Sequence, residues 1–294
     1  MGRSSCGTLA GRPWTMLALA LGSMLALATL AAAEAPACSE CHGDLATAFA
    51  GSAHGKAFAH DTAYGSASCA SCHLGAERHA ESGDPGDVQT AREAGALAAN
   101  AMCASCHENQ RHNAFWRGSA HESAGLACVD CNGVHSQRVD RRGVAVAGTT
   151  ELCLSCHVTM RVAMTQRSRH PLREGAMDCA SCHNPHGGLT EKLVRADSVN
   201  DLCYSCHQEK RGPFLWEHGP VREDCLTCHG PHGSNNDKLL VARASQLCES
   251  CHLQGRHQTV AGLDSSVWNS NRACLNCHSQ IHGSNHVSGP LFQR

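Results

Sequence analysis

Beyond residue 33, the chain has no stretch in which apolar and polar residues alternate long enough to predict a β-strand. The alanine-rich segment 87–100, DVQTAREAGALAAN, favours a helix that leads into Cys103. Residues 82–86, SGDPG, have the Gly, Pro and Asp content of a turn. We therefore expect a fold of short α-helices and irregular loops, with almost no β-structure.

The longest apolar run lies at the start of the chain. Residues 1–33 contain two arginines, an apolar stretch from Trp14 to Leu30, and then small residues up to Ala33. This order predicts a secretory signal peptide cleaved after Ala33. The alternative is a retained membrane anchor, because the run is near the short end of the roughly 17–25 residues that cross a bilayer. No later segment is apolar enough to cross a membrane, so we expect an exported chain that loses Cys6 on processing.

Pairs of cysteines with the spacing Cys-x-x-Cys fill the rest of the chain, and nine of the ten pairs are followed directly by histidine. Cys-x-x-Cys-His is the attachment signature of c-type haem. Two thiols on one turn can form thioethers to one porphyrin, and the adjacent histidine then lies under the iron as its fifth ligand. The predicted attachment cysteines are Cys38, Cys41, Cys69, Cys72, Cys103, Cys106, Cys128, Cys131, Cys153, Cys156, Cys179, Cys182, Cys203, Cys206, Cys225, Cys228, Cys248, Cys251, Cys274 and Cys277. The predicted proximal iron ligands are His42, His73, His107, His157, His183, His207, His229, His252 and His278.

The motifs recur two by two. From the second repeat onward, first motifs begin at 103, 153, 203 and 248 and second motifs at 128, 179, 225 and 274, a period of 45 to 51 residues. Repeats of this size usually stack as one elongated body. We therefore expect residues 34–294 to form one decahaem domain built of five two-haem repeats, at about 38–84, 103–140, 153–195, 203–243 and 248–287. The stretch 203–233 is the least altered copy.

Thirteen of the 22 histidines do not follow a cysteine pair, and they are candidates for the sixth position on each iron. The repeat selects one histidine in the middle of each repeat and one that trails the second motif. The predicted distal ligands are His54, His79, His121, His135, His170, His186, His218, His232, His257 and His282. His60, His112 and His286 are then surplus, although His112 matches His257 in offset and His286 is an alternative to His282.

Asn132 replaces the histidine in the second motif of repeat 2. Three interpretations stay open: a haem site with a weakened or missing fifth ligand, a site that no longer takes haem, and an open iron used for catalysis. The local sequence CNGVH matches CHGPH of repeat 4, which favours a substituted haem site. His135 would then be its sole protein ligand, and whether the site is loaded stays open.

Two other uses of cysteine fit less well. A zinc site is typically built from two Cys-x-x-Cys pairs fifteen to twenty residues apart, and it does not require a histidine after each pair. The pairs here lie 22 to 31 residues apart within a repeat. A disulfide scaffold occurs mainly in small exported domains and also needs no histidine after each pair. Nine Cys-x-x-Cys-His motifs in register favour haem.

Composition limits both the core and the partners. Aromatic residues make up 4% of the chain, too few for a conventional core of this length. Porphyrins can supply that apolar bulk, so we expect no stable fold without haem. Without residues 1–33 the chain has 22 basic and 26 acidic residues, a formal charge of −4, and haem propionates make the loaded protein more acidic. This argues against nucleic-acid binding.

Ten Cys-x-x-Cys motifs in five repeats, GSAH segments, CHxPHG repeats and the ending CLNCHSQIHGSNHVSG resemble the periplasmic decahaem cytochromes of the MtrA, DmsE and PioA type. The resemblance covers residues 38–292, and Cys128 to Asn132 matches a family site without its proximal ligand. It implies bis-histidine haems in a staggered wire, placed partly inside an outer-membrane β-barrel porin. Expected partners are that porin, periplasmic electron carriers and an extracellular multihaem cytochrome, with the chain in the periplasm at the outer membrane.

An iron saturated by two histidines has no open position for substrate, so electron transfer rather than catalysis is expected. A row of such centres can bridge the roughly 30 Å of hydrocarbon that one haem cannot, and a porin would make an acidic wire compatible with lipid. This predicts electron conduction across the outer membrane for metal reduction or iron oxidation. The alternatives are a soluble periplasmic electron shuttle and a multihaem oxyanion reductase with an open haem at Asn132.

Overall fold

The computed structural model describes residues 38–60, 69–135, 149–253 and 273–293. The signal peptide predicted at 1–33 and the distal ligand predicted at His257 lie outside these residues. The described chain divides into two compact bodies. The N-terminal body contains described residues up to Glu108 together with 125–135, and the C-terminal body contains 109–124 and the described residues from Thr149 on.

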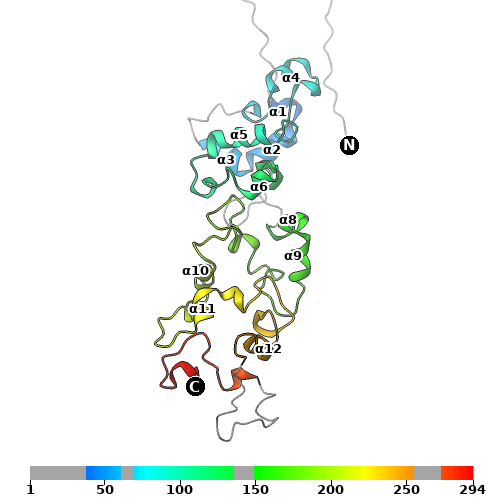
Figure 1. Ribbon diagram of the computed structural model, residues 1–294. Helices are drawn as coiled ribbons and strands as arrows, with labels where there is room; N and C mark the ends of the chain where they lie inside the picture. The colour runs from blue at the N-terminus through cyan, green and yellow to red at the C-terminus, as the bar shows by residue number, and fades with distance from the viewer. Residues whose placement is uncertain (1–37, 61–68, 136–148, 254–272, 294) are drawn as a thin grey trace, which may run out of the picture. The chain divides into compact units, whose positions relative to one another are not determined.

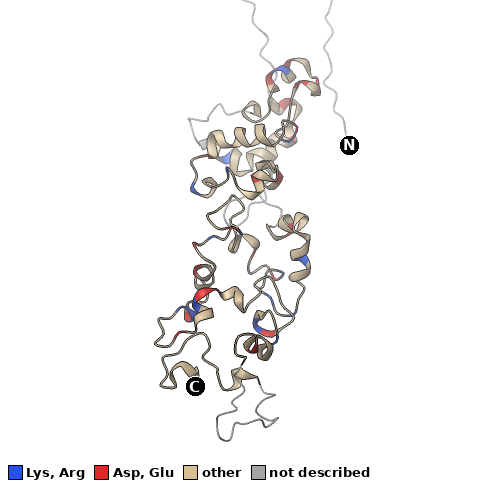
Figure 2. Ribbon diagram, viewed as in Figure 1, with Lys and Arg blue, Asp and Glu red and all other residues tan. Residues whose placement is uncertain are grey.

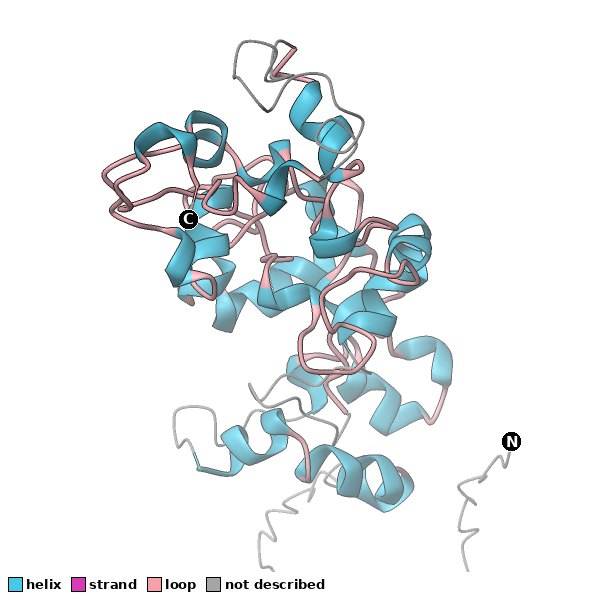
Figure 3. Ribbon diagram, turned by 90° about the horizontal axis from the view of Figure 1, so that it is seen from below, coloured by secondary structure: helices cyan, strands magenta, loops and turns pink. Residues whose placement is uncertain are grey.

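Short helices and loops make up the part of the chain that the structure describes, and no strand is present in it (Figures 1 and 3). Five isolated antiparallel bridges are the only β-pairing there. The α-helices of the N-terminal body are α1 (Cys38–Cys41), α2 (Gly43–Ala50), α3 (Ala53–His60), α4 (Ala76–Ser82), α5 (Ala96–His107) and α7 (Cys128–Cys131). Those of the C-terminal body are α6 (Ala120–Ser123), α8 (Thr149–Cys156), α9 (Val158–Ala163), α10 (Val199–Tyr204), α11 (Gly219–Glu223) and α12 (Ala244–Glu249).

Single 3₁₀ turns complete the regular structure. They are η1 (Cys69–Ser71) and η2 (Pro85–Asp87) in the N-terminal body. In the C-terminal body they are η3 (Arg111–Asn113), η4 (Cys179–Ser181), η5 (Gln208–Lys210), η6 (Cys225–Thr227), η7 (Asp237–Leu239), η8 (Cys274–Asn276) and η9 (Gly289–Leu291). The expected fold of short helices and loops with almost no β-structure is confirmed.

The helix expected at 87–100 begins later than predicted. Before it, Gln89 forms a bridge with Leu74 and residues 91–94 form a turn, next to which the Glu93 carboxylate accepts hydrogen bonds from the backbone N–H and the hydroxyl of Thr90 at 2.8 and 2.9 Å. α5 then starts after Gly95, whose φ of +83° suits only glycine, and runs through the cysteine motif to His107. The turn expected at 82–86 is present, because Asp84 caps η2 by accepting from the Gly86 N–H at 2.8 Å.

The two motifs of a repeat differ in local structure. In repeats 2 to 5 the first motif lies at or near the C-terminal end of an α-helix, as in α5, α8 and α10, and in repeat 1 its two cysteines bound the single turn α1. The second motif is a 3₁₀ turn in four repeats (η1, η4, η6 and η8), but in repeat 2 it is the α-helical turn α7. The motif that lacks its histidine is therefore also the one with a different backbone.

Side chains of this protein form almost no core of their own. Ala99, Ala127, Leu154 and Met164 are the buried apolar residues among those described, whereas Leu97 is 87% and Val287 96% exposed. Acidic and basic residues are interspersed over helices and loops (Figure 2). No helix in the described segments is long and apolar enough to cross a membrane.

Candidate haem-binding sites

Each motif is closed by one backbone hydrogen bond. The N–H of the residue after the second cysteine donates to the carbonyl of the first cysteine, as in His73 to Cys69 at 2.9 Å and His229 to Cys225 at 3.0 Å. Asn132 makes the same bond to Cys128 at 3.0 Å. The bond holds the two cysteines and the following residue on one turn, which is the arrangement that attachment of one porphyrin requires.

The first cysteines of the two motifs in each repeat lie next to each other. In all five repeats these two thiols are close enough for one to shift the pKa of the other, as Cys38 with Cys69, Cys103 with Cys128, Cys153 with Cys179, Cys203 with Cys225, and Cys248 with Cys274. No disulfide joins the twenty described cysteines. Each repeat is therefore a unit in which two attachment turns meet at their leading cysteines.

The thiols in these contacts do not share one protonation behaviour. Burial, followed by the neighbouring Cys225, raises the pKa of Cys203 to about 11. A hydrogen bond from Cys153 instead lowers the pKa of Cys179 to about 7.

An asparagine three residues before the first motif clamps the second motif in repeats 2 and 4. The side chain of Asn200 donates to the carbonyls of Val221 and Arg222 at 3.1 and 3.0 Å and accepts from the Cys225 N–H at 2.8 Å. Asn100 makes matching bonds to Leu126 and Cys128 at 3.1 and 2.8 Å. These bonds fix the backbone just before the second attachment turn.

Histidine rings come together in pairs throughout the described chain. Eight pairs contain the histidine of a Cys-x-x-Cys-His motif, with ring centroids 5.7 to 6.4 Å apart. They are His42 with His79, His107 with His54, His73 with His135, His157 with His121, His207 with His170, His183 with His232, His252 with His218, and His229 with His282. A ninth pair, His112 with His186 at 5.6 Å, contains no motif histidine.

These separations suit two imidazoles on opposite sides of one metal ion. An imidazole nitrogen binds a first-row metal at about 2 Å and the ring centre lies about 1 Å farther out, so two axial rings have centroids about 6 Å apart. No group of three or more His, Cys, Asp or Glu side chains with metal-ligating geometry occurs among the described residues. Two protein ligands are what a haem iron takes, because the porphyrin supplies the other four.

Hydrogen bonds to backbone carbonyls set the tautomer of several paired histidines. Nδ1 of His79 donates to Asp84, that of His183 to Lys192, and that of His229 to Lys238, each at 2.8 Å. A carbonyl only accepts, so Nδ1 carries the proton and Nε2 keeps the lone pair that binds iron.

Burial and neighbouring histidines favour the neutral form of several of the paired rings. Burial, and then the partner ring, lowers the pKa of His54, His73 and His232. For His282 burial comes first and the charge of Lys210 second, and together with His229 they bring the pKa to about 4. Neutral imidazole is the form that ligates a metal. The cysteine turns, ring spacing, tautomers and protonation all fit haem c.

The pairs link one repeat to the next. The motif histidine of a first motif meets the mid-repeat histidine of the preceding repeat, as His207 meets His170. The motif histidine of a second motif meets the trailing histidine of the following repeat, as His183 meets His232. Among the eight described pairs that contain a motif histidine, only that of His42 with His79 lies within one repeat. A repeat therefore does not complete its own set of paired rings.

The glycine after each trailing histidine permits the close contact between one repeat and the repeat before it. Gly233 has φ +154°, and a Cβ there would lie 2.0 Å from the carbonyl oxygen of Ala163 in repeat 3. Gly187 similarly lies against Phe115 of repeat 2, with 2.1 Å to its carbonyl oxygen, and Gly283 against the ring of Phe214 in repeat 4. Only glycine allows the backbone to approach so closely at these positive φ angles.

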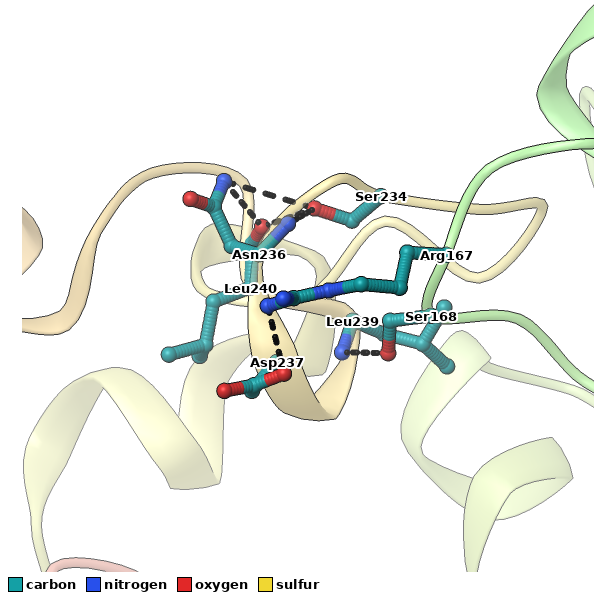
Figure 4. A network of polar contacts seen from close by, with 7 residues as sticks. All are labelled: Arg167, Ser168, Ser234, Asn236, Asp237, Leu239 and Leu240. Atoms are coloured by element: carbon teal, nitrogen blue, oxygen red, sulfur yellow. Dashed lines mark hydrogen bonds and ion pairs between the residues drawn. The ribbon is translucent and has the colours of Figure 1, made fainter.

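Polar contacts between repeats 3 and 4 hold the loop that follows the trailing histidine His232 (Figure 4). Arg167 donates to Asp237 at 2.7 Å, and the Ser168 hydroxyl accepts from the Leu239 N–H at 2.8 Å. Within the loop, Ser234 donates to the Leu240 carbonyl. Because Lys238 of this loop binds Nδ1 of His229, the contacts bear on both His229 and the nearby His232.

A second set of hydrogen bonds joins the mid-repeat histidines to the turns that carry the trailing histidines. Nδ1 of His121 donates to the Pro185 carbonyl at 2.8 Å and Nδ1 of His170 to the Pro231 carbonyl at 2.9 Å. Each proline immediately precedes a trailing histidine. The mid-repeat histidine of one repeat and the trailing histidine of the next are thus oriented together.

The structure brings together nine of the ten predicted distal histidines with another histidine, and the tenth, His257, lies outside the described residues. His278 has its Nδ1 bound to the Leu291 carbonyl at 2.5 Å. His112, which the repeat pattern had left surplus, is also paired. The sequence contained an indication that His112 is not surplus, because repeat 2 has this additional histidine and lacks the histidine after its second cysteine pair. His286 lies against no other histidine ring in the described chain.

Asn132 and His135 do not lie as the sole-ligand hypothesis requires. The Asn132 side chain donates to the carbonyl of Cys128 at 3.0 Å, within its own turn. The ring of His135 is stacked on His73 at 5.8 Å, so His135 is engaged by another motif.

Known proteins share both the motifs and most of the sequence. The family model "doubled CXXCH motif" matches residues 170–212 and 218–257, and "cytochrome c554 and c-prime" matches 102–187. Multiheme cytochrome MtrA of Shewanella baltica (strain OS185) is 45% identical over 238 residues, which cover 77% of this chain and 70% of the relative.

Among solved structures, an undecaheme cytochrome from the S-layer of Carboxydothermus ferrireducens covers 74% of this chain and 32% of its own at 17% identity. Its TM-score of 0.14 is too low to indicate a shared arrangement. The sequence identity to MtrA over most of both chains is what decides the family. The chain belongs to the MtrA family of multihaem c-type cytochromes, electron-transfer proteins rather than enzymes, which bind haem c through Cys-x-x-Cys-His motifs.

Proposed function

We propose that this chain is a decahaem conductor that carries electrons across the outer membrane for extracellular electron transfer. In this proposal it lies at the periplasmic side of that membrane, partly enclosed by a β-barrel porin. The observation that carries the proposal is that every described Cys-x-x-Cys-His histidine between His42 and His252 has a second histidine ring opposite it.

Haem c supplies one-electron redox chemistry when bound. The residues of this chain would hold each iron from both sides, which leaves no coordination position for a substrate. The cysteine pairs would fix each porphyrin covalently. Because the paired rings run from repeat to repeat, the same residues that ligate would also hold successive centres in series.

Spectra of the purified, oxidised holoprotein test the ligation. We expect electron paramagnetic resonance and near-infrared magnetic circular dichroism to show low-spin, bis-histidine haem throughout. Several high-spin haems would contradict the proposed wire.

Membrane experiments test the role of the porin. A tagged chain expressed in its native host should co-purify with an outer-membrane barrel, and vesicles containing both should pass electrons from an external reductant to a trapped redox dye. Vesicles with the barrel alone are the control. Absence of a barrel from the native complex, with full low-spin ligation, would instead support a soluble periplasmic shuttle.

The direction of flow depends on partners at both ends. Periplasmic carriers and an extracellular acceptor, donor or multihaem cytochrome would set it, together with the potential of each haem. Burial, hydrogen bonds to the ligands and nearby charge tune those potentials. Metal reduction and iron oxidation are both compatible with the same chain of ligands.

A further inference from the structure

A largely buried guanidinium lies directly before His170 in the chain. The side chain of Arg169 is 24% exposed, and two of its nitrogens are engaged. Nη1 donates to the Gln166 carbonyl at 3.1 Å and Nη2 to the Glu174 carboxylate at 2.6 Å. Its Nε is buried and has no hydrogen-bond partner in the described chain. Because a guanidinium stays charged and can only donate, this buried Nε needs an acceptor that the neighbouring residues do not supply.

A second buried polar atom without a partner lies in the same segment. It is Oε1 of Gln166, the residue whose carbonyl already accepts from Arg169. This oxygen is 3.2 Å from the position that a Cβ of Gly233 would take, so it lies against the turn that contains His232. A half-turn of the amide exchanges its oxygen for its NH2 group, so Gln166 can also offer a donor. Residues 166–169 therefore contain two buried polar groups, and no residue that the structure describes satisfies either.

Two pairs of facing histidines adjoin this segment, all within the C-terminal body. His170, the next residue after Arg169, faces His207 with ring centroids 6.4 Å apart. Its Nδ1 donates to the carbonyl of the residue before His232 at 2.9 Å, and His232 faces His183 at 6.0 Å. Arg169 thus adjoins the proposed axial ligands of two different haems.

A carboxylate is the acceptor that suits the unsatisfied Nε. Guanidinium and carboxylate form charge-assisted hydrogen bonds, which are shorter and stronger than those between neutral groups. The Glu174 carboxylate is already bound to Nη2 of Arg169 and is 51% exposed. Haem has carboxylates of its own, the propionates at the edge of the porphyrin. The chemistry of the donor therefore fits a haem propionate.

We propose that Arg169 binds a propionate of an adjoining haem through Nε and raises the reduction potential of that haem. The inference rests on the bis-histidine ligation proposed above. The haem is the one held by His170 and His207 or the one held by His183 and His232. Reduction lowers the charge of the iron by one, so a fixed cation beside the haem favours the reduced form. Arginine keeps its charge at all working pH values, so the effect does not depend on pH.

Two marker variants of the holoprotein make these haems separately visible. His170→Met gives the near-infrared signature of His–Met ligation to one haem, and His232→Met gives it to the other. Arg169→Gln is then added to each, and the marked haem is titrated by near-infrared magnetic circular dichroism. In one of the two backgrounds its ratio of reduced to oxidised haem should fall about tenfold, or about 59 mV for a one-electron couple. That background identifies the haem whose propionate is bound.

Three further variants separate a charge that acts on the haem from a merely structural role. Arg173→Gln removes an exposed cation of the same segment and, as the matched control, should leave both marked potentials unchanged. Arg169→Lys keeps the charge and should keep most of the potential. Glu174→Gln removes the exposed carboxylate that partly neutralises Arg169 and should raise the marked potential, even if Arg169→Gln does not fold.

The outcomes that overturn the inference are specific to Arg169. They are unchanged potentials in both marked backgrounds of Arg169→Gln, equal shifts for Arg169→Gln and Arg173→Gln, and no rise in Glu174→Gln. High-spin signal from several haems of the unsubstituted protein would instead count against bis-histidine ligation as a whole.

Discussion

At the scale of single residues, a histidine that serves as an axial ligand has three properties that cannot be inferred from its spacing in the sequence. Its Nε2 must be unprotonated, its ring must face a second ring about 6 Å away, and its other nitrogen must be held. His170 meets all three, through its bond to the Pro231 carbonyl at 2.9 Å and its separation of 6.4 Å from His207. We therefore propose that His170 serves the haem attached at the first motif of the following repeat.

Replacement of His170 by methionine tests that assignment. A thioether keeps the iron six-coordinate but stabilises the reduced state, so His170→Met should leave the haem count unchanged and raise one reduction potential. Redox titration and near-infrared spectra should show His–Met ligation in about one tenth of the haem. His286→Met is the control. A spectrum identical to that of wild type would show that His170 is not a ligand.

At the scale of elements, the sequence predicted the attachment turns and the overall class of secondary structure but not the order of pairing. Cys-x-x-Cys-His is a local motif whose chemistry fixes its own turn, so Cys203 to His207 could be recognised directly. The partner of His207 is 37 residues away in the preceding repeat, and a repeat pattern alone cannot distinguish it from His218 of the same repeat. The pairing of His112 was missed for the same reason, because its partner, His186, is 74 residues away in the following repeat.

The turns that contain a trailing histidine and the glycine after it bring histidines of neighbouring repeats together. Gly233, which follows His232, provides a test. Gly233→Ala would place a methyl group 2.0 Å from the Ala163 oxygen at φ +154°. Backbone strain of this kind costs about 1–3 kcal/mol, and the clash adds to it. We expect a lower free energy of unfolding and displacement of His232, seen as high-spin character in one haem.

The matched control for this substitution is Gly219→Ala in α11 of the same body. A Cβ at Gly219 meets nothing within 4 Å, and its φ is not in the left-handed region. Stability and spin state should therefore stay at their wild-type values. Equal effects of the two substitutions would show that the close approach of Gly233 to Ala163 does not position His232.

At the scale of the whole molecule, the protein side chains alone provide little of the free energy of folding. The four buried apolar residues of the described segments cannot offset the conformational entropy lost when those segments fold. The covalently attached haems would supply both apolar contact and cross-links between repeats. This explains how a chain with 4% aromatic residues can have a defined fold.

The haem-free chain should consequently lack a cooperative unfolding transition. Expression without haem attachment, checked by intact mass, provides the sample, and far-ultraviolet circular dichroism during heating provides the measurement. The loaded protein should melt cooperatively under the same conditions. A sharp transition in the haem-free chain would mean that the side chains hold the fold by themselves.

Interlocking of repeats also predicts what happens when the chain is shortened. A chain that ends after residue 243 keeps repeats 1 to 4 with eight motifs, but it loses His282, which faces His229, and His252, which faces His218. If each repeat completed its own ligand set, all remaining haems would stay low-spin. Because pairing runs between repeats, we expect about one haem in eight to become high-spin, the one attached at Cys225 and Cys228. Mass spectrometry gives the haem count and electron paramagnetic resonance gives the high-spin fraction. A fully low-spin truncated protein would contradict the interlocked arrangement and restore the independent two-haem repeat.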